Sequence, residues 1–305
     1  MHHDVIIIGG SYSGMSAALQ LLRARRDVLI IDAGRPRNLS ASHVHAVLGG
    51  DGMAREALHA ASGEQLSRYP TLHWHEGEAT KASGAQNDFQ VTTNDGMVHK
   101  GRRVLLAIGV SDTLPAIPGI AEEWGRTVFH CPYCHGYELD QGALAVIAIG
   151  ARSLDQVHLL TDWGPVTVFC NRVLSLGQAV RADLVRSGIT IEESCVSHVT
   201  PGCVHLQDGR SLPVAGIFTT TATAPSGNLA RMLGCQLSEL PTEQFIVTTD
   251  RRETTIPGAY ACGDAALRHH SISLAMADGA WAGSQIHHDL VFAGQRSGHG
   301  PELPL

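Results

Sequence analysis

The sequence predicts an α/β fold in which one folding plan is used twice, in two domains. Residues 4–32 contain an apolar run, a glycine-rich turn, a helical segment and a second apolar run, and residues 143–170 repeat that order. With 305 residues, the chain is long enough to build two hydrophobic cores of ordinary size. Both observations favour two Rossmann-like domains with parallel sheets.

The first copy of this plan has the features of a dinucleotide-binding site. We expect a buried strand over Asp4–Ile8, a tight turn from Gly9 to Gly14, a helix, and a second strand that ends in Asp32. Glycines in such a turn let the backbone approach a pyrophosphate, the helix N-terminus offers N–H groups, and the acid binds a ribose hydroxyl. Asp32 follows Gly9 by 32 − 9 = 23 residues, which agrees with the spacing of about 20 for that acid.

One position departs from the dinucleotide pattern. Ser11 stands where Gly-x-Gly-x-x-Gly has its second glycine, and it adds a side chain near the expected phosphates. The carboxylate of Asp32 would repel the 2′-phosphate of NADP, so FAD or NAD is the expected ligand. The alternative is an ordinary strand–turn–helix that binds no nucleotide.

Other segments have clear hydrophobic periodicity or turn residues. They predict an amphipathic helix over 53–69, a small β-meander made of 72–75 and 89–93, a buried strand over 103–109, and a helix of small residues over 273–287. The proline-rich stretch 114–119 predicts a linker, and we place a domain boundary there.

In the second copy, strands at 143–149 and 165–170 flank a helix at 154–163. Its turn, from Ala148 to Ser153, keeps only Gly150 of the three glycines. Less room for a pyrophosphate is therefore expected in the second domain.

Two cysteines separated by two residues lie near the middle of the chain, in the run His130-Cys131-Pro132-Tyr133-Cys134-His135. Such a pair can close a small disulfide, and the flanking histidines would tune its thiolates, so we predict a redox centre. Half of a zinc site is the alternative, which is disfavoured because the chain has no second Cys-x-x-Cys and no His-x3-His. The motif also matches glutaredoxins. The remaining five cysteines lie in apolar segments and are expected in the core: Cys170, Cys195, Cys203, Cys235 and Cys262.

Charge and composition exclude several classes of partner. The formal net charge is −7 and no cluster of Lys or Arg is present, so neither a nucleic acid nor a membrane surface is expected as a partner. The apolar run near the N-terminus is too short for a signal peptide or a membrane span, and no basic leader precedes it. A cytoplasmic protein is expected.

Taken together, these motifs resemble the low-molecular-weight thioredoxin reductase family of flavoproteins over nearly the whole chain. The glycine turn, the strand end Ala107-Ile108-Gly109, the Cys-x-x-Cys and a terminal Gly263-Asp264 occur in the order of that family. The resemblance implies FAD as cofactor, a homodimer, and a second domain inserted into the first. The FAD-binding domain would comprise 1–112 and 245–305, and a pyridine-nucleotide-like domain 113–244. It also implies these cofactor-binding residues: Gly9, Ser11, Gly14, Asp32, Ala107, Gly109, Gly263, Asp264, Ser271 and Ile272.

Two departures from true reductases change the expected function. Reductases carry His-Arg-Arg for the NADPH 2′-phosphate where this chain has Cys170, Asn171 and Arg172, and an aspartate after the second cysteine where this chain has His135. The cysteine motif is similar instead to a branch of NADPH-independent dithiol oxidases from the gliotoxin, holomycin and romidepsin pathways.

That resemblance implies an FAD-dependent oxidase in antibiotic biosynthesis. It would close an intramolecular disulfide in a small-molecule dithiol, with O2 as electron acceptor and H2O2 as product. The expected catalytic residues are Cys131 and Cys134, with His135 as the favoured base and His130 as the second candidate. No metal ligand is predicted. The alternatives are a thioredoxin or disulfide reductase that uses NADPH or another donor, and a flavin-containing protein that sequesters a dithiol.

Overall fold

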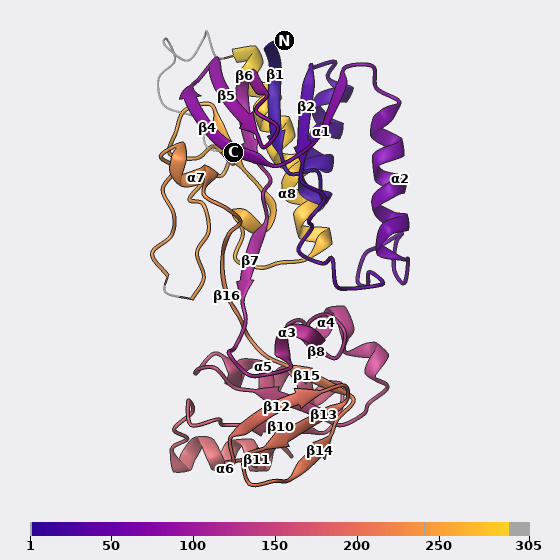
Figure 1. The fold of residues 1–305 in the computed structure, drawn as a ribbon, viewed down its shortest axis with the longest axis vertical. Coiled ribbons are helices and arrows are strands. Elements are labelled where there is room, and N and C mark those ends of the chain that lie inside the picture. Colours follow the sequence, from indigo (N-terminus) through magenta and orange to yellow (C-terminus); the bar gives the residue numbers. More distant parts are fainter. Residues whose placement is uncertain (1, 241, 293–305) are drawn as a thin grey trace, which may run out of the picture. The chain divides into compact units, whose positions relative to one another are not determined.

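The computed structural model describes residues 2–240 and 242–292. The chain forms two compact units: the first unit comprises residues 1–37, 56–111 and 223–305, and the second comprises 38–55 and 112–222. Figure 1 shows both units as a ribbon coloured along the sequence. The predicted α/β fold with two Rossmann-like domains is confirmed, because the sheet of each unit contains parallel strands joined by helical crossovers.

The sheet of the first unit has the strand order β3-β2-β1-β6-β5-β4, and β17 pairs with β6. Its parallel part contains β1 (His2–Ile8), β2 (Val28–Asp32), β3 (Leu72–Glu76), β6 (Val98–Leu106) and β17 (Ala259–Ala261). The strand β5 (Asp88–Thr93) pairs antiparallel with β6, and β4 (Ala79–Ala85) pairs antiparallel with β5. The apolar runs in β1 and β2 reflect burial on both faces of the sheet, as expected of parallel strands.

The predicted β-meander was wrong in one of its strands. Residues 72–76 pair in parallel with β2, and the meander consists of β4, β5 and β6. The sequence of β4, Ala-Thr-Lys-Ala-Ser-Gly-Ala, has few residues that favour strands and contains Gly84 at φ 109°. Its strand conformation depends on pairing with β5, which the local pattern does not reveal.

Helices cover the sheet of the first unit. They are α1 (Tyr12–Arg23), α2 (Arg55–Ser67), the short α7 (Leu229–Met232) and the long α8 (Ile272–Phe292). One apolar cluster joins α1 and α8 to one set of strand side chains, and a second cluster joins α7 to the opposite set. No helix in the described part of the chain is long and apolar enough to cross a bilayer.

The helices α1 and α8 cross at unusually short range because α8 contains glycines at the crossing. A Cβ atom on Gly279 would lie 2.1 Å from the carbonyl oxygen of Ser13, and one on Gly283 would lie 2.5 Å from that of Ala17. The C-terminal part of α8 is tied to β6 by a fully buried ion pair between Arg103 and Asp289. The helix therefore holds α1 firmly against the sheet.

The sheet of the second unit is entirely parallel, in the order β11-β10-β9-β15-β8. Its strands are β8 (Val128–Phe129), β9 (Leu144–Ile147), β10 (Val166–Phe169), β11 (Thr190–Glu192) and β15 (Gly216–Phe218). Its helices are α3 (Ile120–Glu123), α4 (Pro132–His135), α5 (Ser153–Leu159) and α6 (Gln178–Arg186). A separate antiparallel sheet contains β12 (Val196–Thr200), β13 (Cys203–Leu206) and β14 (Ser211–Pro213).

The two connections between the units pair with each other as β7 (Val110–Thr113) and β16 (Ala222–Pro225).

The division of the chain differs from the predicted one in two segments. Residues 38–55 belong to the second unit, where Ser40 packs against Gly125. Residues 223–244 belong to the first unit, because Leu229 and Leu233 are buried in its core. Residues 293–305 of the predicted FAD domain lie outside the described part.

The close crossing of α1 and α8 makes a prediction about stability. Gly279→Ala should lower the free energy of unfolding by about 1–3 kcal/mol, because the added methyl group meets a backbone carbonyl that cannot move away. The control is Gly63→Ala in α2, where a Cβ atom has no neighbour within 4 Å. That change should raise stability by up to about 1 kcal/mol through helix propensity. Denaturant unfolding measures the free energy of unfolding of both variants. Equal changes in the two variants would contradict a tight contact between α1 and α8 at Gly279.

Candidate active site

The cysteine pair of the second unit lies just after β8. Cys131 is the N-cap residue of the one-turn helix α4, Pro132 occupies its first position, and Cys134 lies in the same turn. The amide of Cys134 donates to the carbonyl of Cys131 at 3.3 Å, and the two Sγ atoms lie 2.7 Å apart. Both thiols are partly exposed. The local helix alone therefore brings two accessible sulfur atoms together, as disulfide exchange requires.

The imidazole of His135 packs inside the same loop. Its ring stacks on Phe129 with a centroid separation of 4.3 Å and an interplanar angle of 22°. Burial lowers the pKa of His135 from its ordinary value of 6.5, and the charge that His45 can carry lowers it further, whereas Glu138 raises it. The side chain is therefore neutral at neutral pH and able to accept a proton.

The other predicted base, His130, lies one residue before the pair and is partly buried. Its carbonyl oxygen accepts a hydrogen bond of 2.7 Å from Nε2 of the buried Gln156. Between the cysteines, the ring of Tyr133 meets Trp163 edge to face at 5.3 Å. The four predicted catalytic residues thus share one loop, which runs from β8 to the end of α4.

A further histidine, His45, lies near this loop although no motif in the sequence indicates it. This residue lies in the segment 38–55, far from the cysteines in sequence, yet its Nδ1 is 3.2 Å from a carboxylate oxygen of Glu138. Its Nδ1 also lies 4.0 Å from Oδ1 of Asp51, six residues on, but no spacing rule for a site marks that pair. Only the packing of 38–55 on the second unit reveals the pair of His45 and Glu138.

In the first unit, the glycine turn follows β1. Gly9 has φ 108°, and a Cβ atom there would lie 2.2 Å from the carbonyl oxygen of Ala107. A Cβ atom on Gly14 would lie 1.9 Å from the carbonyl oxygen of Gly9. Ser11 is the N-cap residue of α1, in extended conformation. The turn is therefore a tight backbone cradle at the carboxyl end of β1, the position where α/β sheets bind dinucleotides.

A cavity of about 500 Å³ lies at the ends of β2 and β3, beside this turn. Asp32 forms part of its wall and accepts a hydrogen bond of 3.1 Å from the amide of Gly10. The volume and the acid suit the adenosine half of a dinucleotide. The lining also contains residues that the sequence analysis did not single out for a site, because they follow no spacing rule: Ala33, Gly34, His59, Trp74, Glu76 and Gly77.

The remaining residues predicted to bind the cofactor also lie in the first unit. Gly109 follows the end of β6 and has φ 63°. Asp264 is paired with Arg37, whose Nη1 lies 3.1 Å from Oδ2 of Asp264 and 2.8 Å from Nδ1 of His270. The preceding residue, Gly263, packs against Ser13 and has φ 68°.

At the start of α8, the hydroxyl of Ser271 accepts a hydrogen bond of 3.1 Å from the amide of Leu274, and Ile272 is the first residue of the helix. Ser271 therefore has a structural role as a helix cap.

The corresponding turn of the second unit is different. Ser153 is fully buried, and its hydroxyl accepts a hydrogen bond of 3.2 Å from the amide of Ile149, so its side chain fills the turn. At the end of β10, the side-chain oxygen of Asn171 accepts a hydrogen bond of 3.1 Å from the amide of Val196. Arg172 is exposed and is the only basic residue of Cys170-Asn171-Arg172. The turn has little to hold a 2′-phosphate.

Four of the five other cysteines are buried, as predicted: Cys170, Cys195, Cys235 and Cys262. Burial raises the pKa of the thiols of Cys170, Cys235 and Cys262, which keeps them protonated and unreactive. Cys203 is only partly buried, because it lies at the start of β13 in the small antiparallel sheet.

Comparisons with known proteins agree with this arrangement. Residues 3–279 match the model of the pyridine nucleotide-disulphide oxidoreductase family. Thioredoxin reductase sirT of Leptosphaeria maculans is 30% identical, over 93% of this chain and 93% of that protein. Thioredoxin reductase aclD of Aspergillus oryzae is also 30% identical, over 95% of this chain and 96% of that protein.

Among solved structures, an oxidoreductase from Agrobacterium tumefaciens is 44% identical and superposes with a TM-score of 0.94, which covers 96% of this chain and 99% of that one. With its two Rossmann-like units and its paired thiols, the chain belongs to the pyridine nucleotide-disulphide oxidoreductase family and, within it, to the thioredoxin-reductase-like proteins.

Proposed function

We propose that this protein is an FAD-dependent dithiol oxidase, which closes an intramolecular disulfide in a small natural-product dithiol. Overall, the dithiol and O2 would give the cyclic disulfide and H2O2. The observation that carries this direction of electron flow is the nucleotide turn of the second unit. The Ser153 side chain is buried there, and the Asn171 side chain is hydrogen-bonded to the amide of Val196, so the turn makes a poor NADPH site. The two thiols of the same unit are nevertheless present and lie close together.

The residues of the first unit suit FAD. Gly9 and Gly14, with the backbone of Ala107, form the cradle that a pyrophosphate needs, and Asp32 beside the cavity would bind a ribose hydroxyl. When bound, FAD supplies a two-electron acceptor that O2 can reoxidise. Membership in a family of flavin enzymes supports this assignment.

The thiol chemistry would take place at Cys131 and Cys134. In the oxidised pair, a substrate thiolate attacks Sγ of Cys131, a substrate–enzyme disulfide forms, and Cys134 leaves as a thiolate. The second substrate thiol then attacks the substrate sulfur of that mixed disulfide and displaces Cys131. The products are a cyclic disulfide and a reduced cysteine pair, so the electron pair of the substrate has passed to the enzyme.

His135 would remove the proton from each attacking thiol. An ordinary thiol has a pKa near 8.5 and is mostly protonated at neutral pH, so a neutral base increases the fraction that can attack. The lowered pKa of His135 keeps the ring unprotonated for this role. The neighbouring His45 and Glu138, which contact each other, shift the pKa of His135 in opposite directions.

A disulfide reductase is the second candidate, and the names of the relatives favour it. Proteins that are 30% identical over nearly the full chain are called thioredoxin reductases. Such an enzyme would use the same thiols in the opposite direction, with NADPH or another donor as the source of electrons.

The direction of electron flow can be tested with the anaerobic FAD-loaded protein. Mixing with dithiothreitol, a dithiol that closes a ring on oxidation, should bleach the visible flavin absorbance, whereas NADPH should not. Admission of O2 should restore the colour and release one H2O2 for each dithiol oxidised. Bleaching by NADPH alone would favour the reductase and overturn the oxidase proposal.

Loss of either active cysteine should stop the reaction. Cys131→Ser and Cys134→Ser should each abolish dithiol oxidation, measured as O2 uptake, because the exchange needs both sulfur atoms. FAD absorbance should remain, since the residues expected to hold it lie in the first unit. Cys203→Ser is the matched control and should keep full activity. Substantial turnover by either active-site variant would rule out the exchange scheme.

The role of His135 predicts a pH dependence. A base acts only when it is unprotonated, so activity is present above its pKa and is lost as the pH falls through that value. Because the pKa of His135 is lowered, this acid limb should lie below pH 6.5. His135→Ala should slow anaerobic flavin reduction by dithiol about 10²-fold and remove the limb.

The neighbour His45 offers a sharper form of this test. His45→Ala removes the side chain whose electrostatic effect lowers the pKa of His135, so the acid limb should move to higher pH. His43→Ala, an exposed residue of the same segment, is the control and should leave the profile unchanged. An identical acid limb in the His45 and His135 variants and the unaltered protein would exclude His135 as the base.

A further inference from the structure

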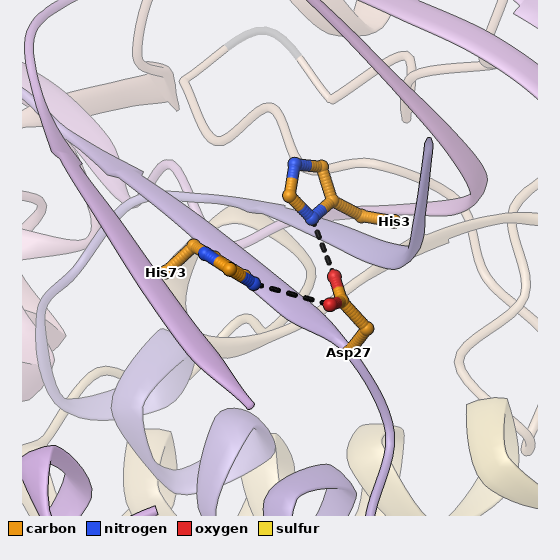
Figure 2. Close-up of side chains that lie close together, drawn as sticks. All are labelled: His3, Asp27 and His73. Carbon is orange, nitrogen blue, oxygen red and sulfur yellow. Dashed lines mark hydrogen bonds and ion pairs between the residues drawn. The ribbon is translucent and has the colours of Figure 1, made fainter. Parts of the chain in front are cut away.

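A second cluster of chemically active side chains lies in the first unit and consists of His3, Asp27 and His73 (Figure 2). Nδ1 of His3 is 2.5 Å from Oδ1 of Asp27, and Nε2 of His73 is 3.1 Å from Oδ2 of the same carboxylate. The two imidazole rings are 5.0 Å apart, with an angle of 57° between their planes. Both rings therefore direct a nitrogen at one acid, from two sides.

Three neighbouring elements supply these side chains. His3 lies on β1 and His73 on β3, while Asp27 directly precedes β2, the strand between them. The amide of Asp27 donates to Asp4 at 3.2 Å, and its carbonyl accepts from the amide of Val5 at 3.2 Å. These backbone bonds hold the acid between the two histidines, so the arrangement is built before any ligand arrives.

The three side chains offer a ligand set for a metal ion. One donor atom from each, two imidazole nitrogens and one carboxylate oxygen, lies within 4.8 Å of the others. Two histidines and one carboxylate form a typical zinc ligand set, with a fourth position for water. The His3 side chain is 6% exposed, but those of His73 and Asp27 are 36% and 43% exposed, so an ion can reach them from solvent.

We propose that His3, Asp27 and His73 bind a divalent transition metal ion of the zinc type. Without the ion, a neutral imidazole donates its N–H group to the carboxylate. With the ion, the same two nitrogens become ligands and the hydrogen of each ring moves to its other nitrogen. A protonated imidazole cannot bind the ion, so binding must weaken in acid. The sequence does not reveal this site, because His3 and His73 are separated by 73 − 3 = 70 residues.

The proposed metal site is distinct from the expected cofactor site. It lies at the amino ends of the strands, whereas Gly9 and Asp32 lie at the carboxyl ends. Seven residues of β1 separate the two ends, which corresponds to about 20 Å at the usual rise of a strand. Zinc binding there needs neither the flavin nor the cysteine pair, so the proposal is independent of the proposed function.

Calorimetric titration with Zn²⁺ tests the proposal. The tag-free, FAD-loaded Cys131→Ser/Cys134→Ser protein is used, because reduced thiols at those positions would bind zinc themselves. We expect one Zn²⁺ per chain near neutral pH, with an affinity that falls when the titration is repeated at lower pH. His73→Ala and Asp27→Asn should each weaken binding more than about 10-fold, since each loses a direct ligand.

The controls separate this site from the many other histidines. His198 and His205 stack at 4.2 Å in the second unit, and His198→Ala in the same background should leave the affinity unchanged. Far-ultraviolet circular dichroism and flavin absorbance check that His73→Ala folds. Absence of Zn²⁺ binding would overturn the proposal and leave a hydrogen-bonded cluster only. Binding that survives His73→Ala would place the ion elsewhere and also overturn it.

Discussion

The first unit depends on close contact between backbones where no Cβ atom is present. Gly14 lies against the carbonyl of Gly9, Gly9 against that of Ala107, and Gly279 against that of Ser13, at separations that no side chain would allow. These contacts place the start of α1 on the sheet and fix the turn that precedes it. The position of Asp32 follows, because its carboxylate binds the amide of Gly10. The expected nucleotide site is thus a consequence of packing as much as of ligand chemistry.

The second unit has the same order of strands and helices, but its turn after β9 keeps only one of the three glycines. Its turn contains the buried side chain of Ser153, which accepts a hydrogen bond from the amide of Ile149. The unit keeps the overall strand and helix order, since the order depends on hydrophobic pattern and not on the glycines. Two copies of one architecture can therefore differ in ligand binding through a few side chains at one sheet edge.

Electrostatics in the thiol loop depend on a segment that is distant in sequence. Burial of the His135 ring against Phe129 lowers its pKa, and His45 adds to that effect from residues 38–55. The carboxylate of Glu138 contacts His45 and opposes the shift. The lowered pKa of His135 thus results from the packing of two chain segments, whereas an isolated histidine has a pKa near 6.5.

Local sequence determined the elements whose chemistry is local. The glycine turn, the strand that ends in Asp32 and the cysteine pair of Cys-Pro-Tyr-Cys could all be predicted, because the residues that define each lie within a few positions or follow a fixed spacing. Tertiary structure alone decided the features that join distant residues. These include the parallel pairing of β3, the membership of 38–55 in the second unit, the approach of His45 to Glu138, and the cluster of His3, Asp27 and His73. The physical reason is that strand partners and clusters of charged side chains are set by the packing of the whole unit, which no local pattern records.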